Sequence, residues 1–174
     1  MAVTAEAVKQ LRERTGAGMM ECKKALVETN GDLDAAAELM RKSGLAKADK
    51  KAARVAAEGV IAIERSADTR AAAIVEVNCE TDLVAHENDF EAYAANVAKL
   101  ALAQRPATLV ALLALPFEGG GTLDDVRRAL VAKIGENIGV RRFEVVGSPV
   151  VVGAYLHGSR IGALVSLNKG DDSV

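Results

Sequence analysis

The sequence predicts an α+β fold in which helices come first and antiparallel strands follow. Apolar residues recur at helical spacing in the first 44 residues, and two pairs of short apolar runs, each pair around a turn, lie beyond Gly59. The composition is consistent with a large helical part. Because 50% of the residues are hydrophobic and only 3% are aromatic, the composition favours helices that pack closely on small side chains.

Composition and charge exclude several classes of function. The net charge of −2 provides no positive field that would attract nucleic acid or anionic lipid. The scarcity of aromatic residues argues against a protein that binds single-stranded nucleic acid. No apolar run approaches the roughly 18–20 residues of a membrane span, and the first residues lack the pattern of a signal peptide. Cys22 and Cys79 have no metal-ligand spacing. We expect a soluble cytoplasmic protein that binds neither nucleic acid nor a membrane.

The first 44 residues are predicted to form three short helices. Thr4 caps the first helix, which ends before the breaker cluster Thr15–Gly18. The second helix runs from about Met19 to Thr29, and Asp32 caps a third that stops at Ser43-Gly44. Such a unit forms a compact bundle near the lower size limit for independent folding.

Residues 45–58 are predicted to be a separate helical connector. Lysines and Arg54 alternate there with alanines, so a solvated helix explains the charge better than a phosphate site does.

Strands and further helices are predicted from Gly59 onward. In chain order they are a strand at 60–64, a turn at 67–70, a strand at 73–79, helices at 88–103 and 122–134, and a strand at 140–146. The apolar stretch 107–117 is assigned to neither class.

A second hairpin follows, with strands at 150–156 and 161–167. Either it joins the first sheet or it begins a second copy of the unit. The second interpretation is preferred, because a lone hairpin is marginal in water and the chain stops at Asp171–Val174 without a terminating element. We therefore expect a piece of a longer chain, in which 55–147 form one core subdomain and 148–174 the first hairpin of an incomplete second one.

Three segments are candidates for function. At the start of the second helix, Met20 is expected to face inward and Met19 outward, where an exposed methionine suits a protein contact. Asn78–Val84 follows a strand and is either a capped turn or a rigid loop that presents an acid and an apolar side chain to a partner. Lys133–Gly139 is explained by helix capping, although its glycines would also allow the backbone of a partner protein to approach closely.

Several segments of the chain carry a distinctive pattern; in order they are Leu11–Leu26, Asn30–Asp32, Met40–Gly44, Val77–Asp82, Lys133–Ile138 and His157–Gly162. Together they resemble the bacterial translation elongation factor Ts family. The resemblance covers the whole chain and implies a ubiquitin-associated-like three-helix module with a linker helix at 1–54, followed by two related α+β subdomains. It implies a chain that is shortened at its C-terminus.

The resemblance implies a guanine-nucleotide exchange factor for elongation factor Tu rather than an enzyme. Such a factor binds the GDP-bound and nucleotide-free partner and promotes GDP release by inserting a loop near the partner's Mg²⁺ and phosphate site. It needs no cofactor of its own, because GDP and Mg²⁺ are bound by the partner. A dimer of heterodimers through the missing segments is also implied.

The resemblance further implies roles for residues at the matching positions. These are docking by Arg12, Met19, Met20 and Lys23, insertion near the partner's Mg²⁺ by Thr81, Asp82, Leu83 and Val84, and core contacts by Ile134, Gly135 and His157. The chain departs from the family in having Leu83 where phenylalanine is common and His86 where a basic residue is common.

Two alternatives remain open. The first is a three-helix protein-binding adaptor without exchange activity. The second is a small enzyme that uses Glu80, Asp82 and His157, which would require these side chains to converge on one pocket.

Overall fold

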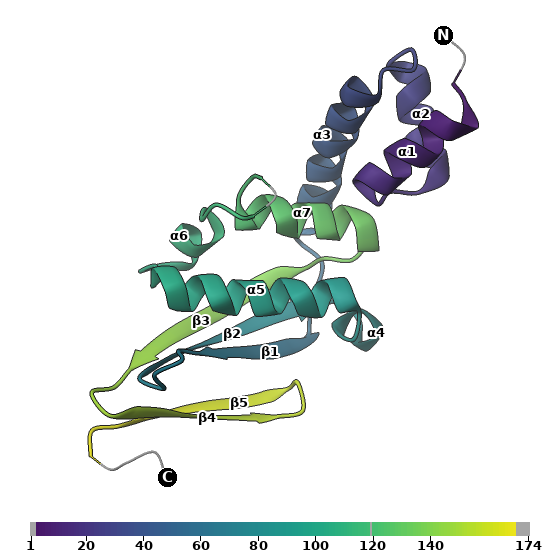
Figure 1. Ribbon diagram of the computed structural model, residues 1–174. Coiled ribbons are helices and arrows are strands. Elements are labelled where there is room, and N and C mark those ends of the chain that lie inside the picture. The colour runs from purple at the N-terminus through teal and green to yellow at the C-terminus, as the bar shows by residue number, and fades with distance from the viewer. Residues whose placement is uncertain (1–2, 119, 170–174) are drawn as a thin grey trace.

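The computed structural model describes residues 3–118 and 120–169, which form a helical arm and a layered body of sheets and helices (Figure 1). The arm consists of α1 (Ala5–Thr15), α2 (Met19–Glu28) and the first part of α3 (Leu33–Lys51). The body contains β1 (Glu58–Arg65), β2 (Ala71–Cys79), α4 (Asp82–Ala85), α5 (Asn88–Gln104), α6 (Leu109–Leu113), α7 (Leu123–Ile134), β3 (Gly139–Gly147), β4 (Val151–His157) and β5 (Ile161–Leu167). All strand pairs are antiparallel, so the predicted α+β class is confirmed.

The arm has a small core of its own. Its buried side chains are Val8, Leu11, Cys22, Ala25, Leu26 and Ala36. The predicted caps of two helices are confirmed: the Thr4 side chain accepts a hydrogen bond from the Ala7 N–H, and Asp32 accepts from two N–H groups at the start of α3. Gly16, with φ +67°, ends α1 in the left-handed conformation.

The predicted end of the third helix at Ser43-Gly44 is wrong, because α3 continues without a break to Lys51. Gly44 faces α7, and a Cβ atom at this position would lie 3.2 Å from the Ala132 Cβ. Ala48, one turn further on, is 2% exposed. The glycine therefore allows two helices to pack closely instead of ending one. For the same reason, residues 45–58 are not a separate solvated helix.

The predicted inward position of Met20 is also wrong. Met20 is 75% exposed and Met19 is 60% exposed, whereas Cys22 is fully buried. Residues that are two positions apart in a helix are separated by about 200° around its axis. The burial of Cys22 therefore turns Met20 to the opposite side of α2.

A three-stranded sheet in the order β1-β2-β3 forms the centre of the body. Helix α5 packs across one face of this sheet, and α6 and α7 lie beyond it (Figure 1). The largest fully buried side chains between these layers are Phe90, Val97, Leu112, Leu123, Val131 and Ile138. They meet Val75 and Val77 of β2, the central strand. The predicted strands and the helices at 88–103 and 122–134 are confirmed, and the unassigned stretch contains the single short helix α6.

The hairpin β4–β5 is a separate two-stranded sheet and does not extend the first one. It lies against the face of the first sheet that α5 leaves open (Figure 1). A Cβ atom at Gly162 would lie 2.6 Å from Ile61 Cγ2 and 2.9 Å from Ile74 Cδ1, so the two sheets approach through a position without a side chain. The chain end at Asp171–Val174, used above to predict an incomplete unit, lies outside the described residues.

Candidate functional site

The single-turn helix α4 presents an acid and an apolar side chain to solvent. Thr81 is its N-cap and accepts a hydrogen bond from the Val84 N–H at 3.5 Å. Val84 and Ala85 are buried in the core, whereas Asp82 is exposed and Leu83 is 75% exposed. An apolar side chain this exposed stabilises the isolated chain little, so the arrangement suits contact with a partner.

The strand that leads into α4 ends in a buried thiol. Cys79 Sγ lies 3.1 Å from the Thr81 carbonyl oxygen and donates to it. Burial, with the nearby carboxylates of Glu136 and Glu58, raises the pKa of Cys79 to about 11. The thiol is therefore protonated at neutral pH, as this hydrogen bond requires.

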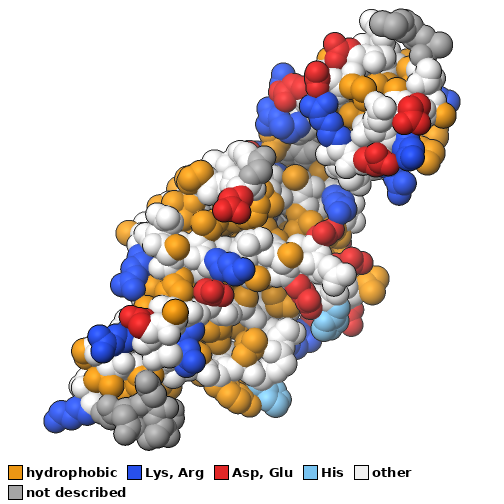
Figure 2. Space-filling view, viewed as in Figure 1, with side chains coloured by type: hydrophobic (Ala, Val, Ile, Leu, Met, Phe, Trp, Pro, Cys, Tyr) orange, Lys and Arg blue, Asp and Glu red, His pale blue; other side chains and the backbone are white. Residues whose placement is uncertain are grey.

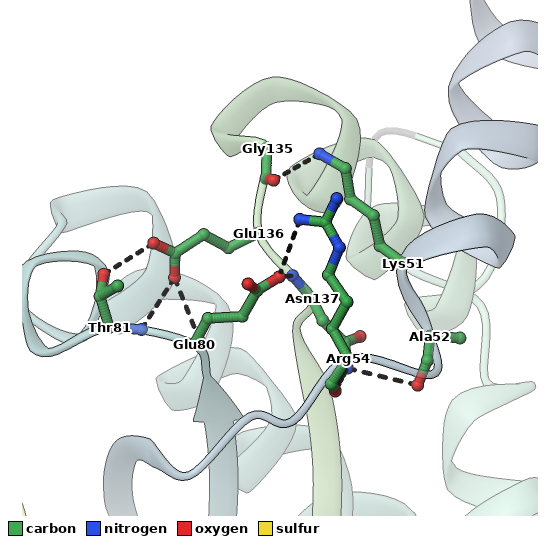
Figure 3. Close-up of polar contacts among 8 residues, drawn as sticks. All are labelled: Lys51, Ala52, Arg54, Glu80, Thr81, Gly135, Glu136 and Asn137. Atoms are coloured by element: carbon green, nitrogen blue, oxygen red, sulfur yellow. Dashed lines mark hydrogen bonds and ion pairs between the residues drawn. The ribbon is translucent and has the colours of Figure 1, made fainter.

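Glu136 holds the segment before α4 from across the fold. One carboxylate oxygen accepts the Glu80 N–H at 3.1 Å and the Thr81 N–H at 3.0 Å, and the other accepts the Thr81 hydroxyl at 2.7 Å (Figure 3). These three donors lie 55 or 56 residues earlier in the chain. Sequence reasoning explained the segment around Glu136 by helix capping and missed this residue.

The residues around Glu136 also join α3 to the body. Lys51 Nζ donates to the Gly135 carbonyl, and Arg54 Nη1 lies 3.5 Å from Glu80 Oε1. The side-chain amide of Asn137 donates to the Arg54 carbonyl at 2.7 Å (Figure 3). We call this set the polar junction; it consists of Lys51, Arg54, Glu80, Thr81, Glu136 and Asn137. It connects the end of α3, the β2–α4 loop and the α7–β3 loop.

The predicted docking residues lie on the helical arm. Arg12 on α1 and Met19, Met20 and Lys23 on α2 are all exposed. In Figure 1, α1 and α2 are well separated from α4, so the structure does not bring these residues together with Asp82. Figure 2 shows acidic and basic side chains interspersed over the visible face, without an extended basic area.

The three predicted core contacts differ in their surroundings. Ile134 is partly buried against the core. Gly135, with φ +94°, ends α7, as the glycine pattern predicted. His157 is exposed at the end of β4, and its Nδ1 lies 3.0 Å from the Tyr155 hydroxyl oxygen.

The hairpin turn lies at the same end of the sheet as α4. Arg160, in this turn, pairs with Glu58, and Glu58 is opposite Cys79 in the β1–β2 register. The predicted site residues of the body therefore extend from α4 toward the tip of the hairpin, where His157 lies.

No group of three or more histidine, cysteine or acidic side chains within residues 3–118 and 120–169 could hold a metal ion. Glu80, one of the acids considered for catalysis, accepts the Asn137 N–H at 2.6 Å and pairs with Arg54. Among the helices of the described part, none is both long and apolar enough to span a bilayer.

Comparison with known proteins gives the family. The sequence profile described as Elongation factor TS matches residues 80–174. A protein named Elongation factor Ts from Methylococcus capsulatus is 61% identical over 172 residues, which are 98% of this chain and 59% of that protein. Proteins of the same name from Alkalilimnicola ehrlichii and Legionella pneumophila are 60% and 52% identical, and the matches cover 60% and 59% of their lengths.

The chain thus spans about 60% of the length of the curated relatives that it matches. The profile match includes α4, the polar junction from Glu80 onward and the hairpin. The chain belongs to the elongation factor Ts family.

Proposed function

We propose that the chain is a guanine-nucleotide exchange factor for elongation factor Tu, and that it promotes GDP release by inserting α4 near the partner's Mg²⁺ and phosphate site. The observation that carries this proposal is the exposure of Asp82 and Leu83 on a short helix whose preceding loop is held from across the fold. Membership of the family supports it. No covalent bond is formed or broken in such an exchange, and GDP and Mg²⁺ belong to the partner.

The exchange follows from reciprocal coupling between two ligands of one protein. A factor that binds nucleotide-free elongation factor Tu more tightly than the GDP-bound form must weaken GDP by the same ratio. In this mechanism Leu83 separates helices of the partner, and Asp82 brings a negative charge toward a site that holds a phosphate and its metal ion. Thr81 and Val84 keep α4 in place, the first as its cap and the second as its buried anchor.

The remaining predicted residues act in binding. Arg12, Met19, Met20 and Lys23 dock the helical arm on the partner, and Ile134, Gly135 and His157 contribute from the body. We assign residues 1–54 to a ubiquitin-associated-like module with its linker, 55–147 to a core subdomain and 148–174 to the first hairpin of another. The arm and the body each have a buried cluster, which supports a division into these two parts, with Ala48 of α3 belonging to the cluster of the body. A cytoplasmic location and a dimer of heterodimers through segments absent here complete the proposal.

An adaptor without exchange activity is the second candidate. The exposure of Met19 and Met20, at 60% and 75%, favours protein docking through α2 whatever follows from it. An adaptor would bind the partner without changing its nucleotide.

The test is the release of a fluorescent GDP analogue from purified elongation factor Tu at fixed Mg²⁺, with and without the 174-residue chain. We expect acceleration that is lost in Asp82→Ala and retained in Glu91→Ala, which removes an exposed carboxylate from α5. Binding without acceleration by the unmodified chain would favour the adaptor. Absence of both binding and acceleration would refute the proposed function for this chain.

A further inference from the structure

The geometry points to Glu136 as a positioning residue that fixes α4 in its exposed orientation, with Glu80 providing the reciprocal contact. The contact itself is a property of this chain alone. Its consequence for nucleotide exchange rests on the proposed function.

The first argument is the shortness of α4. A helix of four residues closes too few backbone hydrogen bonds to be stable alone, because nucleation of a helical turn is unfavourable. Its orientation must therefore come from its ends. Buried Val84 and Ala85 hold its C-terminal end, and the segment at Glu80 and Thr81 must be held by something else.

The second argument is the pairing of the backbone before α4. Beyond Cys79, the last residue of β2, the N–H groups of Glu80 and Thr81 have no partner in the sheet ladder. Both donate to one oxygen of Glu136, at 3.1 and 3.0 Å. Hydrogen bonds to a carboxylate are about twice as strong as neutral ones, so this side chain replaces the ladder at the point where the strand ends.

The third argument is the link to the cap. Thr81 donates its hydroxyl hydrogen to the other oxygen of Glu136 at 2.7 Å, while its oxygen accepts the Val84 N–H. Glu136 therefore orients the side chain that begins α4. Because the two following residues, Asp82 and Leu83, are the exposed ones, a rotation at Thr81 would redirect both.

The contact is reciprocal. Glu80 accepts the Asn137 N–H at 2.6 Å, so each loop donates backbone hydrogen bonds to the glutamate of the other. The pair is flanked by Arg54, whose Nη1 lies 3.5 Å from Glu80. The two loops are thus bound as one unit, and removal of Glu136 would leave the Glu80 and Thr81 N–H groups to solvent.

The direct test is amide hydrogen exchange, measured by NMR on the full 174-residue chain. In Glu136→Ala the amides of Glu80 and Thr81 should exchange about 10-fold or more faster, as expected for loss of a charged hydrogen bond, while the amides of Val75 and Val77 stay unchanged. Glu136→Gln keeps one acceptor oxygen and should give an intermediate effect. Glu144→Ala, an exposed carboxylate on β3, is the control. Unchanged protection of both loop amides in Glu136→Ala would overturn the inference.

The second readout is the kinetics of GDP release at increasing concentrations of the chain. Glu136→Ala should lower the limiting rate about 10-fold and change the half-saturating concentration by a smaller factor, because the predicted docking residues on α1 and α2 are untouched. In a Leu83→Ala background, which keeps part of the acceleration, Glu136→Ala should have a smaller effect, since part of its effect passes through the orientation of Leu83 on α4. Equal losses in both backgrounds would overturn a positioning role. If the unmodified chain does not accelerate release at all, the proposed function fails, and the amide exchange result still decides whether Glu136 positions the loop.

Discussion

Glu80 and Glu136 are bound to each other's loops: Glu136 accepts the N–H of Glu80 at 3.1 Å, and Glu80 accepts the N–H of Asn137 at 2.6 Å. Both carboxylates accept hydrogen bonds from backbone N–H groups that lie outside the hydrogen-bond pattern of the sheets and helices. Two like charges in one place repel, but Arg54, which pairs with Glu80, offsets them. The segment before α4 is therefore fixed by interactions between residues distant in the sequence.

Replacement of Leu83 by phenylalanine should accelerate GDP release. A phenyl ring adds apolar area to the inserted side chain and would stabilise the exchange complex by about 1 kcal/mol, or roughly fivefold in rate. The change should not affect the thermal midpoint, because Leu83 is 75% exposed. The measurement is the limiting rate of analogue release, with Leu83→Ala as the opposing variant, expected to be slower. A rate for Leu83→Phe equal to or below that of the unmodified chain would contradict the proposed insertion.

The double variant Met19→Ser/Met20→Ser should weaken docking without unfolding the arm. Both side chains are more than half exposed, so the free energy of unfolding should change by less than about 0.5 kcal/mol. The half-saturating concentration for GDP release should rise about tenfold, the effect of losing a contact of more than 1 kcal/mol. Val110→Ser, on α6 and 79% exposed, is the matched control. If both variants shift the concentration equally, α2 is not the docking surface.

Gly44→Leu should destabilise the chain by about 1–3 kcal/mol, the range for overpacking. A Cβ atom at Gly44 would already lie 3.2 Å from the Ala132 Cβ, and the larger side chain would push α3 away from α7. Urea unfolding measures the effect. Ala46→Leu, on the exposed side of the same helix, should change stability little. Since leucine is a better helix former than glycine, a stabilised Gly44→Leu variant would mean that the two helices are not closely packed.

Asp125→Asn should reduce the sensitivity of the fold to acid. Hydrogen bonds from the backbone and side chain of Thr122 lower the pKa of Asp125 in the capping box of α7. A lowered folded-state pKa gives stability that is present above the unfolded value of about 3.9 and is lost as the pH falls through the folded value. The difference in unfolding free energy between pH 6 and pH 3 should therefore be smaller in Asp125→Asn.

At pH 6 the Asp125→Asn variant should be less stable than the unmodified chain, because an amide oxygen accepts the two Thr122 hydrogen bonds less strongly than a carboxylate does. Glu144→Gln, which changes an exposed carboxylate on β3, should leave the acid dependence unchanged. Identical pH profiles for Asp125→Asn and the unmodified chain would show that the capping box does not contribute to it.

Local pattern predicted most of the elements, and a distant contact accounts for the error at Gly44. Thr4 and Asp32 cap neighbours within a few residues, and the strand at 73–79 has a local apolar pattern, so spacing was enough to place them. Gly44 was interpreted as a helix end because a glycine has that effect in isolation; its contact with Ala132, far along the chain, changes its role.

The candidate site divides in the same way. The exposure of Asp82 and Leu83 follows from a short capped turn after a strand, which a sequence displays. The role of Glu136 depends on donors 55 residues away, and periodicity does not reveal such a pairing. The available signal was the position of Glu136 and Asn137, two polar residues between the helix that ends at Ile134 and the fully buried Ile138. Polar side chains confined there must find partners nearby.

The continuity of α3 has a consequence for binding at two surfaces. Its 19 residues extend about 28 Å at the usual rise, from the arm that presents Met19 and Met20 to the polar junction that holds α4. The connection is a continuous helix and not a flexible linker. A partner that binds one of these surfaces therefore finds the other one already in position. The second contact then adds to affinity without the entropy loss of ordering a flexible linker. A break in α3 would weaken the combined attachment even with both surfaces intact.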